Sequence, residues 1–284
     1  MKKTFKTIRL PGGWYTVVAA DFPEDMLREL ALAPHPVFDR VLKAEGHNIV
    51  AVKAIKIGSN KLNAVFKIAV PAENIRHWFR SFRKSKSLRD FLIAQKLLET
   101  GIPTAKPFAA MWQRSFGRVV KSIYICEYLD KSWNLDTFAF KPPFILSPSR
   151  RREFARKIAV MLATMHNNKI IHRDTKATNF LVQEKDGLQI VCVDMDGIKP
   201  RRFFLCSHIF QALWRLGASL MGTPNVHQTD FLRAFNFYCD LTGISQNTRR
   251  RFYRRLAAKA QKKFKQKQAF WHAHSIDMDR MRML

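Results

Sequence analysis

The chain has 284 residues, of which 47% are hydrophobic and 25% are charged, and this ordinary balance argues against intrinsic disorder and against a fibrous repeat. It carries 50 Lys and Arg residues against 22 Asp and Glu residues, so its formal net charge is +28. Repulsion of this size favours an anionic partner, such as nucleic acid, an anionic membrane face or a phosphorylated substrate, with a solvated basic surface as the alternative.

Two features of the sequence indicate a cytoplasmic protein. The first residues are basic but lack the apolar stretch of a secretory signal, and no run of about 18 apolar residues predicts a membrane-spanning helix. The four cysteines are scattered without the spacing of a zinc site, and Cys126 and Cys192 lie in apolar runs where buried thiols are expected.

The N-terminal part of the chain divides into a leader and a strand-rich portion. Residues 1–45 are predicted to form an irregular leader, packed on the following lobe, around a short helical run at 24–32. The segments 47–58 and 62–70 alternate like strands, and Gly58-Ser59-Asn60 between them predicts a β-hairpin.

A helix, a strand and a second helix follow. Residues 74–101 predict a helix with a basic front that ends at Gly101, and residues 119–129 read as a strand. The segment 149–168 predicts a helix because its apolar residues recur on one face, namely Phe154, Ile158, Met161, Leu162 and Met165.

The C-terminal part is predicted to be mainly helical. Asp186-Gly187 indicates a tight hairpin, helices are expected at 208–221 and 229–243, and a basic amphipathic tail follows at 248–268. The order of elements predicts an α+β protein with two lobes and a cleft, the N-lobe at 46–130 and the helical C-lobe at 131–284.

The segment HRDTKATN at residues 172–179 has the protein-kinase pattern H-R-D-x-x-x-x-N. In phosphoryl transfer from ATP, Asp174 would accept or orient the proton of the attacked hydroxyl, and Asn179 would give an amide oxygen to a metal ion. A second carboxylate must reach the same metal, and Asp194 directly follows the apolar run 188–193. An isolated H-R-D triplet usually forms local ion pairs, but the order of loop, strand and carboxylate favours catalysis. Asp196 is expected to be an exposed turn residue rather than a second metal ligand.

Three segments together resemble the lipopolysaccharide kinase family, which phosphorylates Kdo or heptose sugars of the bacterial inner core. They are IPTAKP at 102–107, HRDTKATN at 172–179 and VDMDG at 193–197, and the resemblance extends over roughly residues 60–240. It implies a two-lobed protein-kinase-like fold with a small β-rich N-lobe and a larger, mainly helical C-lobe. It also implies ATP and Mg²⁺ as cofactors.

The resemblance further implies which residues bind ATP. A strand lysine that holds the phosphates matches Lys67, with Lys53 and Lys56 as second choices. The acidic residue that pairs with this lysine is normally Glu in the family, and here it is Asp90, one methylene shorter. Glu127, at the end of a strand, marks the linker where adenine meets backbone groups.

Some kinase features are missing from the sequence. No G-x-G-x-x-G loop precedes Lys67, Met-Asp-Gly follows Asp194 in place of Phe-Gly, and no A-P-E segment follows. Lipopolysaccharide kinases commonly lack the first two as well. These departures separate the chain from ordinary protein kinases.

Basic residues with interleaved aromatic residues gather in two segments. The residues before Asp90 are Arg76, Trp78, Phe79, Arg80, Phe82, Arg83, Lys84, Lys86 and Arg89. The tail carries Arg249, Arg250, Arg251, Phe252, Arg254, Arg255, Leu256, Lys259, Lys262, Lys263, Phe264 and Lys265. Such surfaces suit an anionic glycolipid at a membrane or, less well, RNA, and the tail is equally well explained by a helix that packs its apolar stripe on the C-lobe.

The expected function is ATP-dependent phosphorylation of a sugar hydroxyl in the lipopolysaccharide inner core, on the cytoplasmic face of the inner membrane. The alternatives are a kinase that acts on another small-molecule or protein hydroxyl, and a nucleotide-binding or RNA-binding pseudokinase. A small polycationic substrate would need an acidic cleft, and the shortage of carboxylates in this chain disfavours such a substrate.

Overall fold

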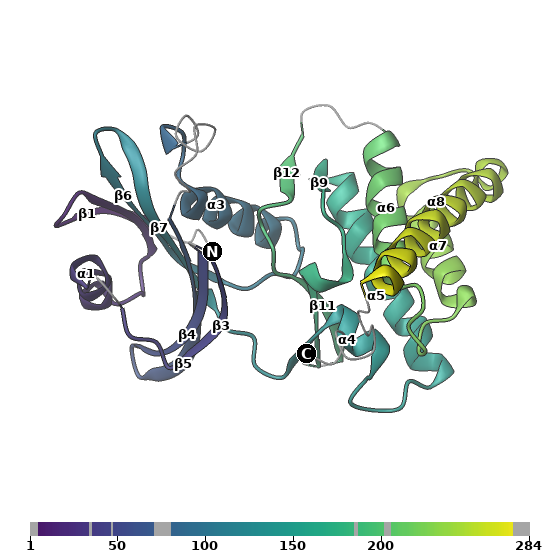
Figure 1. Ribbon diagram of the computed structural model, residues 1–284, viewed down its shortest axis with the longest axis horizontal. Coiled ribbons are helices and arrows are strands. Elements are labelled where there is room, and N and C mark those ends of the chain that lie inside the picture. Colours follow the sequence, from purple (N-terminus) through teal and green to yellow (C-terminus); the bar gives the residue numbers. More distant parts are fainter. Residues whose placement is uncertain are drawn as a thin grey trace. The chain divides into compact units, whose positions relative to one another are not determined.

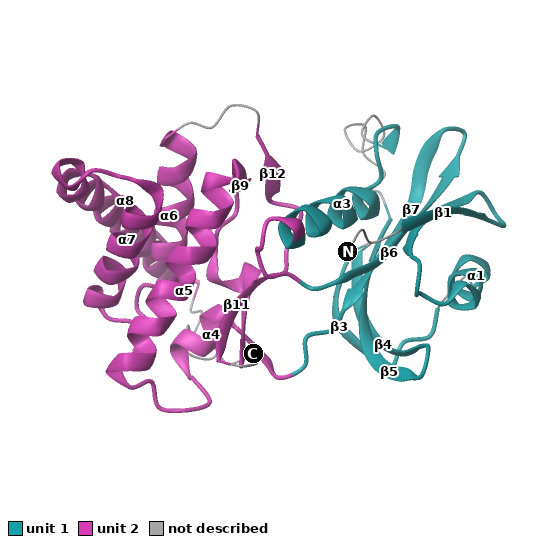
Figure 2. Cartoon of the chain, turned by 180° about the vertical axis from the view of Figure 1, so that it is seen from behind, with its two compact units in different colours: residues 1–98, 105–130 teal, residues 99–104, 131–284 magenta. Residues whose placement is uncertain are grey.

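The structure is a computed structural model that describes residues 5–33, 36–46, 48–70, 81–184, 187–201 and 206–274. The chain divides into two compact units (Figure 2). Unit 1 comprises residues 1–98 and 105–130, and unit 2 comprises residues 99–104 and 131–284. A β-rich unit and a mainly helical unit confirm the predicted α+β class.

Unit 1 is built on a seven-stranded antiparallel sheet with the order β1-β2-β6-β7-β5-β4-β3 (Figure 1). Its strands are β1 (Phe5–Leu10), β2 (Trp14–Ala19), β3 (Arg40–Glu45), β4 (Asn48–Ile57), β5 (Asn60–Ala69), β6 (Pro107–Ser115) and β7 (Arg118–Glu127). The predicted hairpin is confirmed, since β4 and β5 pair from Asn48 with Ala69 to Ile57 with Asn60.

The prediction of an irregular leader is wrong for most of residues 5–45. Strands β1, β2 and β3 lie in the same sheet as the rest of unit 1, and β2 pairs directly with β6. The alternation in β2 buries Trp14, Thr16 and Val18 on one face of the sheet. A period of two over six residues is short, and the adjacent hairpin turn at Gly12 and Gly13 interrupts it, so the pattern is too weak to predict a strand.

Two helices cover opposite faces of this sheet (Figure 1). Helix α1 (Glu24–Leu32) buries Leu27 and Leu30 in the same apolar cluster as Phe66 of β5. Helix α3 (Lys86–Glu99) covers the other face and buries Phe91 and Leu97.

Helix α3 begins later than the sequence predicted. Ser85 caps it, because the Ser85 hydroxyl accepts a hydrogen bond from the Leu88 N–H at 3.1 Å, and Arg83 and Lys84 precede the helix in a bend. The predicted positions Arg76, Trp78, Phe79 and Arg80 lie outside the described residues.

Unit 2 combines five helices with short strands over the part of the chain that the structure describes. The helices are α4 (Leu135–Phe140), α5 (Pro148–Asn167), α6 (Cys206–Leu220), α7 (Gln228–Thr242) and α8 (Gln246–Ala273). The strands are β8 (Ser132–Asn134), β9 (Ile170–His172), β10 (Phe180–Glu184), β11 (Leu188–Cys192) and β12 (Ile198–Pro200), with the short 3-10 helix η1 (Ala177–Asn179) before β10. Helix α5 buries the five apolar residues of its predicted face.

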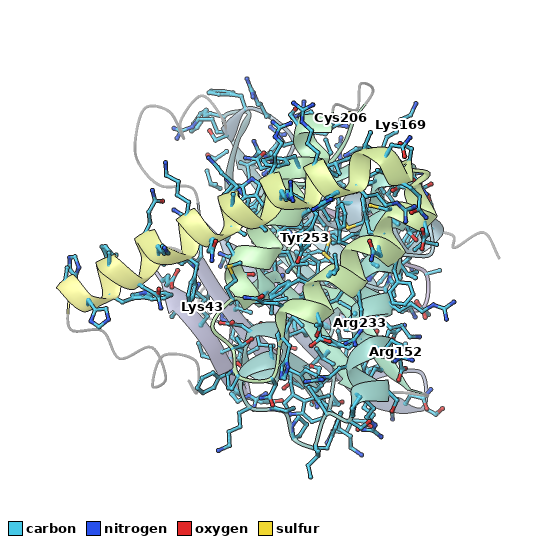
Figure 3. The ribbon with its side chains drawn as sticks, turned by 90° about the vertical axis from the view of Figure 1, so that its right-hand side faces the viewer. Lys43, Arg152, Lys169, Cys206, Arg233 and Tyr253 are labelled. Carbon is cyan, nitrogen blue, oxygen red and sulfur yellow. The ribbon has the colours of Figure 1, made fainter. Side chains whose placement is uncertain are left out.

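The predicted basic tail is helix α8, which packs across α6 and α7 (Figure 3). Leu256 and Ala260 are its buried residues, and Phe252 contacts the rings of Phe210 and Phe235. The apolar stripe of the tail is therefore used for packing on unit 2, which was one of the two readings left open by the sequence. None of the helices in the described residues is both long and apolar enough to span a membrane.

Candidate active site

The segment HRDTKATN lies between β9 and β10, and backbone hydrogen bonds hold it in place. The Arg173 N–H donates to the Gly197 carbonyl at 2.8 Å, and the Lys176 N–H donates to the Asp174 carbonyl at 2.9 Å. The Ala177 N–H donates to the Ser219 hydroxyl of α6 at 2.9 Å. The loop is thus anchored to the turn before β12, to itself and to α6, which limits the positions that its side chains can reach.

The Asp174 carboxylate lies among three polar side chains. Its Oδ2 is 3.2 Å from the Lys176 Nζ and 3.4 Å from the Asn179 Nδ2, and its Oδ1 is 3.7 Å from the Arg215 Nη1. Arg215 is itself oriented, because Nη1 donates to the Arg173 carbonyl at 2.8 Å. Asp174 is half exposed, so this carboxylate can meet a substrate while its neighbours fix its direction.

The predicted metal ligands lie at the same end of two paired strands, since Asn179 directly precedes β10 and Asp194 follows β11. The Val193 N–H donates to the Asn179 carbonyl at 3.2 Å. Asp194, the residue after Val193, is therefore held close to Asn179. The Asn179 Nδ2 donates to the Asp174 carbonyl at 2.7 Å, which leaves its Oδ1 as the atom able to accept or to ligate.

This donor set fits a hard divalent cation. An amide oxygen and a carboxylate are oxygen ligands, and Mg²⁺ commonly takes one or two protein ligands and completes its shell with water and phosphate. No group of three His, Cys, Asp or Glu suited to a metal occurs among the described residues.

The buried His172 side chain accepts a hydrogen bond from the backbone of this loop. Its ring is 1% exposed, its Nδ1 accepts the Asp174 N–H at 3.3 Å, and burial lowers its pKa to about 4. The imidazole is therefore neutral at neutral pH. A Cβ atom on Gly197 would lie 2.7 Å from this ring, so only glycine lets β12 approach so closely.

Lys67 and Asp90 of unit 1 share a neighbourhood. Phe66 and Ile68 face α1, so Lys67, between them on β5, faces α3, the helix that carries the buried Asp90. Both charges act on the Cys126 thiol, whose pKa is raised to about 11 mainly by burial, with Lys67 opposing and Asp90 adding to the shift. The sheet and α3 thus bring the two predicted residues toward one buried group.

The second-choice lysines occupy other positions. Lys53 forms an ion pair with Glu29 of α1 at 3.2 Å, and Lys56 is exposed. Asp196 lies in an exposed turn, as predicted, and its N–H donates to the Asp194 Oδ1 at 3.1 Å.

Glu127 ends β7, and its backbone is engaged within unit 1. The Glu127 N–H donates to the Lys106 carbonyl at 2.9 Å, and the Tyr128 N–H donates to the Asn63 carbonyl at 3.0 Å. A nucleotide base can use these two donors only by displacing those carbonyls.

Sequence reasoning overlooked Lys176 and Arg215. Lys176 lies in the loop two residues after Asp174, so its spacing was available as a signal. Arg215 comes from α6, and nothing in its local sequence indicates that it reaches Asp174.

Comparison with known proteins adds an independent finding. The family model described as "Lipopolysaccharide kinase (Kdo/WaaP) family" matches residues 52–238. A 3-deoxy-D-manno-octulosonic acid kinase of Vibrio vulnificus (strain YJ016) is 27% identical over 125 residues, which cover 44% of this chain and 49% of that protein. The enzyme of the same name from Haemophilus influenzae (strain 86-028NP) is 24% identical over 159 residues, which cover 55% and 63%. The chain thus spans about half to two thirds of the length of these relatives.

A solved structure shares the fold. The structure titled "WaaP in complex with acyl carrier protein" matches with a TM-score of 0.60 and 18% identity, over 79% of this chain and 88% of that chain. At this identity the match supports the kinase-like fold alone.

Proposed function

Because the chain belongs to the lipopolysaccharide kinase (Kdo/WaaP) family, we propose that it transfers the terminal phosphoryl group of ATP to a sugar hydroxyl of the lipopolysaccharide inner core. The observation that carries this proposal is the Asp174 carboxylate, held between Lys176 and Arg215. A positioned carboxylate can take the hydroxyl proton as the new bond to phosphorus forms, and adjacent cations can offset charge on the transferred group.

Asn179 and Asp194 are the proposed ligands of Mg²⁺. When bound by these two residues, the ion would offset the negative charge of the ATP phosphates during transfer. The orientation of Asn179 supports this role, because its Nδ2 already donates to the Asp174 carbonyl and its Oδ1 is the atom left to ligate a cation.

Lys67 is proposed to bind the ATP phosphates, with Asp90 as its acidic partner. The field of both side chains at Cys126 supports the pairing, and the burial of Asp90 favours a cation beside it. The end of β7 at Glu127 remains the predicted location for adenine, through backbone groups other than the engaged N–H of Glu127 and of Tyr128.

The acceptor is proposed to be Kdo or heptose, and Kdo is the first to test. The relatives from Vibrio vulnificus and Haemophilus influenzae are both named 3-deoxy-D-manno-octulosonic acid kinases, which favours an acidic sugar.

A transfer assay tests the proposal. The purified protein is incubated with ATP labelled at the γ-phosphate, Mg²⁺, and either a Kdo-terminated or a heptose-extended core glycolipid without phosphate on its core sugars. Label should enter one of the two acceptors, and Asp174→Asn should reduce the rate by about 10²-fold or more. Asp196→Asn is the matched control, because it removes a nearby exposed carboxylate that has no proposed role. Equal labelling by the parent and Asp174→Asn would refute the catalytic role of Asp174, and no labelling of either acceptor would refute the function.

A membrane contact is proposed at the tip of the β6–β7 hairpin, consistent with action on the cytoplasmic face of the inner membrane. Phe116 is 98% exposed at this tip, and Phe82, which packs beside Gly117, is 46% exposed. Arg83 and Lys84 are exposed next to it, and the Arg83 carbonyl accepts a hydrogen bond from Arg114 at 3.1 Å. Exposed aromatic rings beside basic residues suit the surface of an anionic membrane.

Sedimentation with lipid vesicles tests this contact. The parent should bind vesicles that contain phosphatidylglycerol and not vesicles of phosphatidylcholine alone, and Phe116→Ser should weaken binding. Ile145→Ser is the matched control, since Ile145 is 92% exposed in unit 2. Equal weakening by the two variants, or none by Phe116→Ser, would refute this contact.

A further inference from the structure

A cationic pocket opens beside Asp174, within unit 2. Its cavity volume is about 520 Å³, which lies in the range of small-molecule sites. Asp174 and Lys176 of the loop and Trp214 and Arg215 of α6 form one side of it. The other side is formed by α8, in a part of the chain that follows the residues matched by the family model.

One face of α8 supplies lysines to this pocket. Lys259, Lys262, Lys263 and Lys267 line it, with Gln266 between the last two. Their spacing of three and four residues places them on one side of a helix. Leu256 and Ala260, which are buried, attach α8 to the rest of unit 2, so these lysines extend from a packed helix rather than from a loose tail.

The pocket has far more positive than negative charge. Asp174 is its single acidic lining residue among the described residues, and this carboxylate already has Lys176 and Arg215 beside it. Within the residues that the structure describes, no carboxylate forms an ion pair with Lys259, Lys262 or Lys263. Like charges at this helical spacing repel one another, and an anionic ligand would relieve that repulsion.

The aromatic wall of the pocket is also polarised by cations. The Arg215 guanidinium lies 5.6 Å from the centre of the Trp214 ring, and the Lys259 ammonium lies 5.8 Å from it. A flat apolar surface between cations can contact the carbon face of a sugar ring while the cations contact its acidic group.

We propose that this pocket is the acceptor site and that it binds the acidic group of a sugar, a carboxylate or a phosphate, through Lys259, Lys262 and Lys263. The bound acid orients the sugar so that one of its hydroxyls meets Asp174. The inference rests on the proposed function and adds to it the residues that bind the acidic group of the acceptor, which lie on α8.

Ligand binding without ATP separates this inference from the proposed function. The probe is a deacylated core oligosaccharide whose single acidic group is the Kdo carboxylate, compared by calorimetry with its methyl ester at constant salt. The parent should bind the acid at least tenfold more tightly than the ester. The double variant Lys262→Ala/Lys263→Ala should bind the two forms with similar affinity.

Arg254→Ala/Lys265→Ala is the matched control. It removes the same charge from exposed positions of α8 that do not line the pocket, and alanine favours the helix in both double variants. This control should keep the preference for the acid. Equal binding of acid and ester by the parent, or an equal loss in both double variants, would overturn the inference. Binding with the expected selectivity but no phosphoryl transfer would refute the proposed function and leave only the binding of acidic sugars by α8 supported.

Discussion

Acid should destabilise unit 2 through His166, because burial keeps this imidazole neutral in the folded state. His166 is 4% exposed, and burial lowers its pKa from 6.5 to about 4. Its Nδ1 lies 2.7 Å from the Tyr238 hydroxyl, and burial raises the pKa of that phenol, which therefore stays protonated and can donate to Nδ1.

The sign and size of the effect follow from the two states. Between pH 6.5 and about 4 the unfolded chain binds a proton at His166 and the folded chain does not, so the free energy of unfolding falls as the pH falls. The gap between the two pKa values corresponds to about 3 kcal/mol, of which about 2 kcal/mol is lost by pH 5. This is a large part of a typical stability of roughly 5–15 kcal/mol.

Urea unfolding at pH 7 and at pH 5 measures this loss. The double variant His166→Phe/Tyr238→Phe replaces both hydrogen-bonding partners with apolar rings, a change that can be nearly neutral at pH 7. The parent should lose about 2 kcal/mol more than this variant between the two pH values. Tyr238→Phe alone keeps the imidazole and should keep the acid sensitivity. The same loss in the parent and in the double variant would refute the reasoning, since other titrating groups are common to both.

Three further substitutions probe close contacts, each with urea unfolding as the assay. Gly197→Ala places a Cβ atom 2.7 Å from the His172 ring and should cost about 1–3 kcal/mol, with a loss of phosphoryl transfer. Gly222 has a φ of +76°, and a Cβ atom there would lie 2.5 Å from a ring carbon of Phe264 on α8. Gly222→Ala should therefore displace α8 and cost about 1–3 kcal/mol. Thr104→Val removes a hydroxyl that donates at 2.6 Å to a buried backbone carbonyl of β11, and should cost about 1–3 kcal/mol. Unchanged stability in any of these variants would contradict the contact concerned.

The sequence predicted the elements whose pattern is long and local. Helix α5 has apolar residues on one side over 20 residues, and each of Phe154, Ile158 and Met165 is buried. The order of strand-rich and helical parts, which sets the α+β class, follows from such patterns. The candidate catalytic loop could be predicted because its residues are contiguous, from His172 to Asn179.

The surroundings of Asp174 could be predicted only in part. Lys176 is near in sequence, whereas Arg215 reaches the carboxylate from α6 and Lys262 comes from α8. These residues meet because α8 packs across α6. The two helices pack closely where small residues face each other, as Ala260 faces Gly217. Helical periodicity predicts that α8 has an apolar face but does not predict which helix it contacts.

The positive charge of α8 lies on a packed helix and not on a loose tail. All charged residues of α8 are basic, and its N-terminal part is tied to α7 by the ion pair of Arg249 with Asp240 at 2.6 Å. A loose basic tail would raise the rate of encounter with any anion, because its field acts over distance without a defined geometry. Lysines at defined places beside Asp174 can instead distinguish one acidic sugar from another by the position of its charge. Under the proposal above, the charge of α8 bears on which acceptor is chosen as well as on attraction to anionic surfaces.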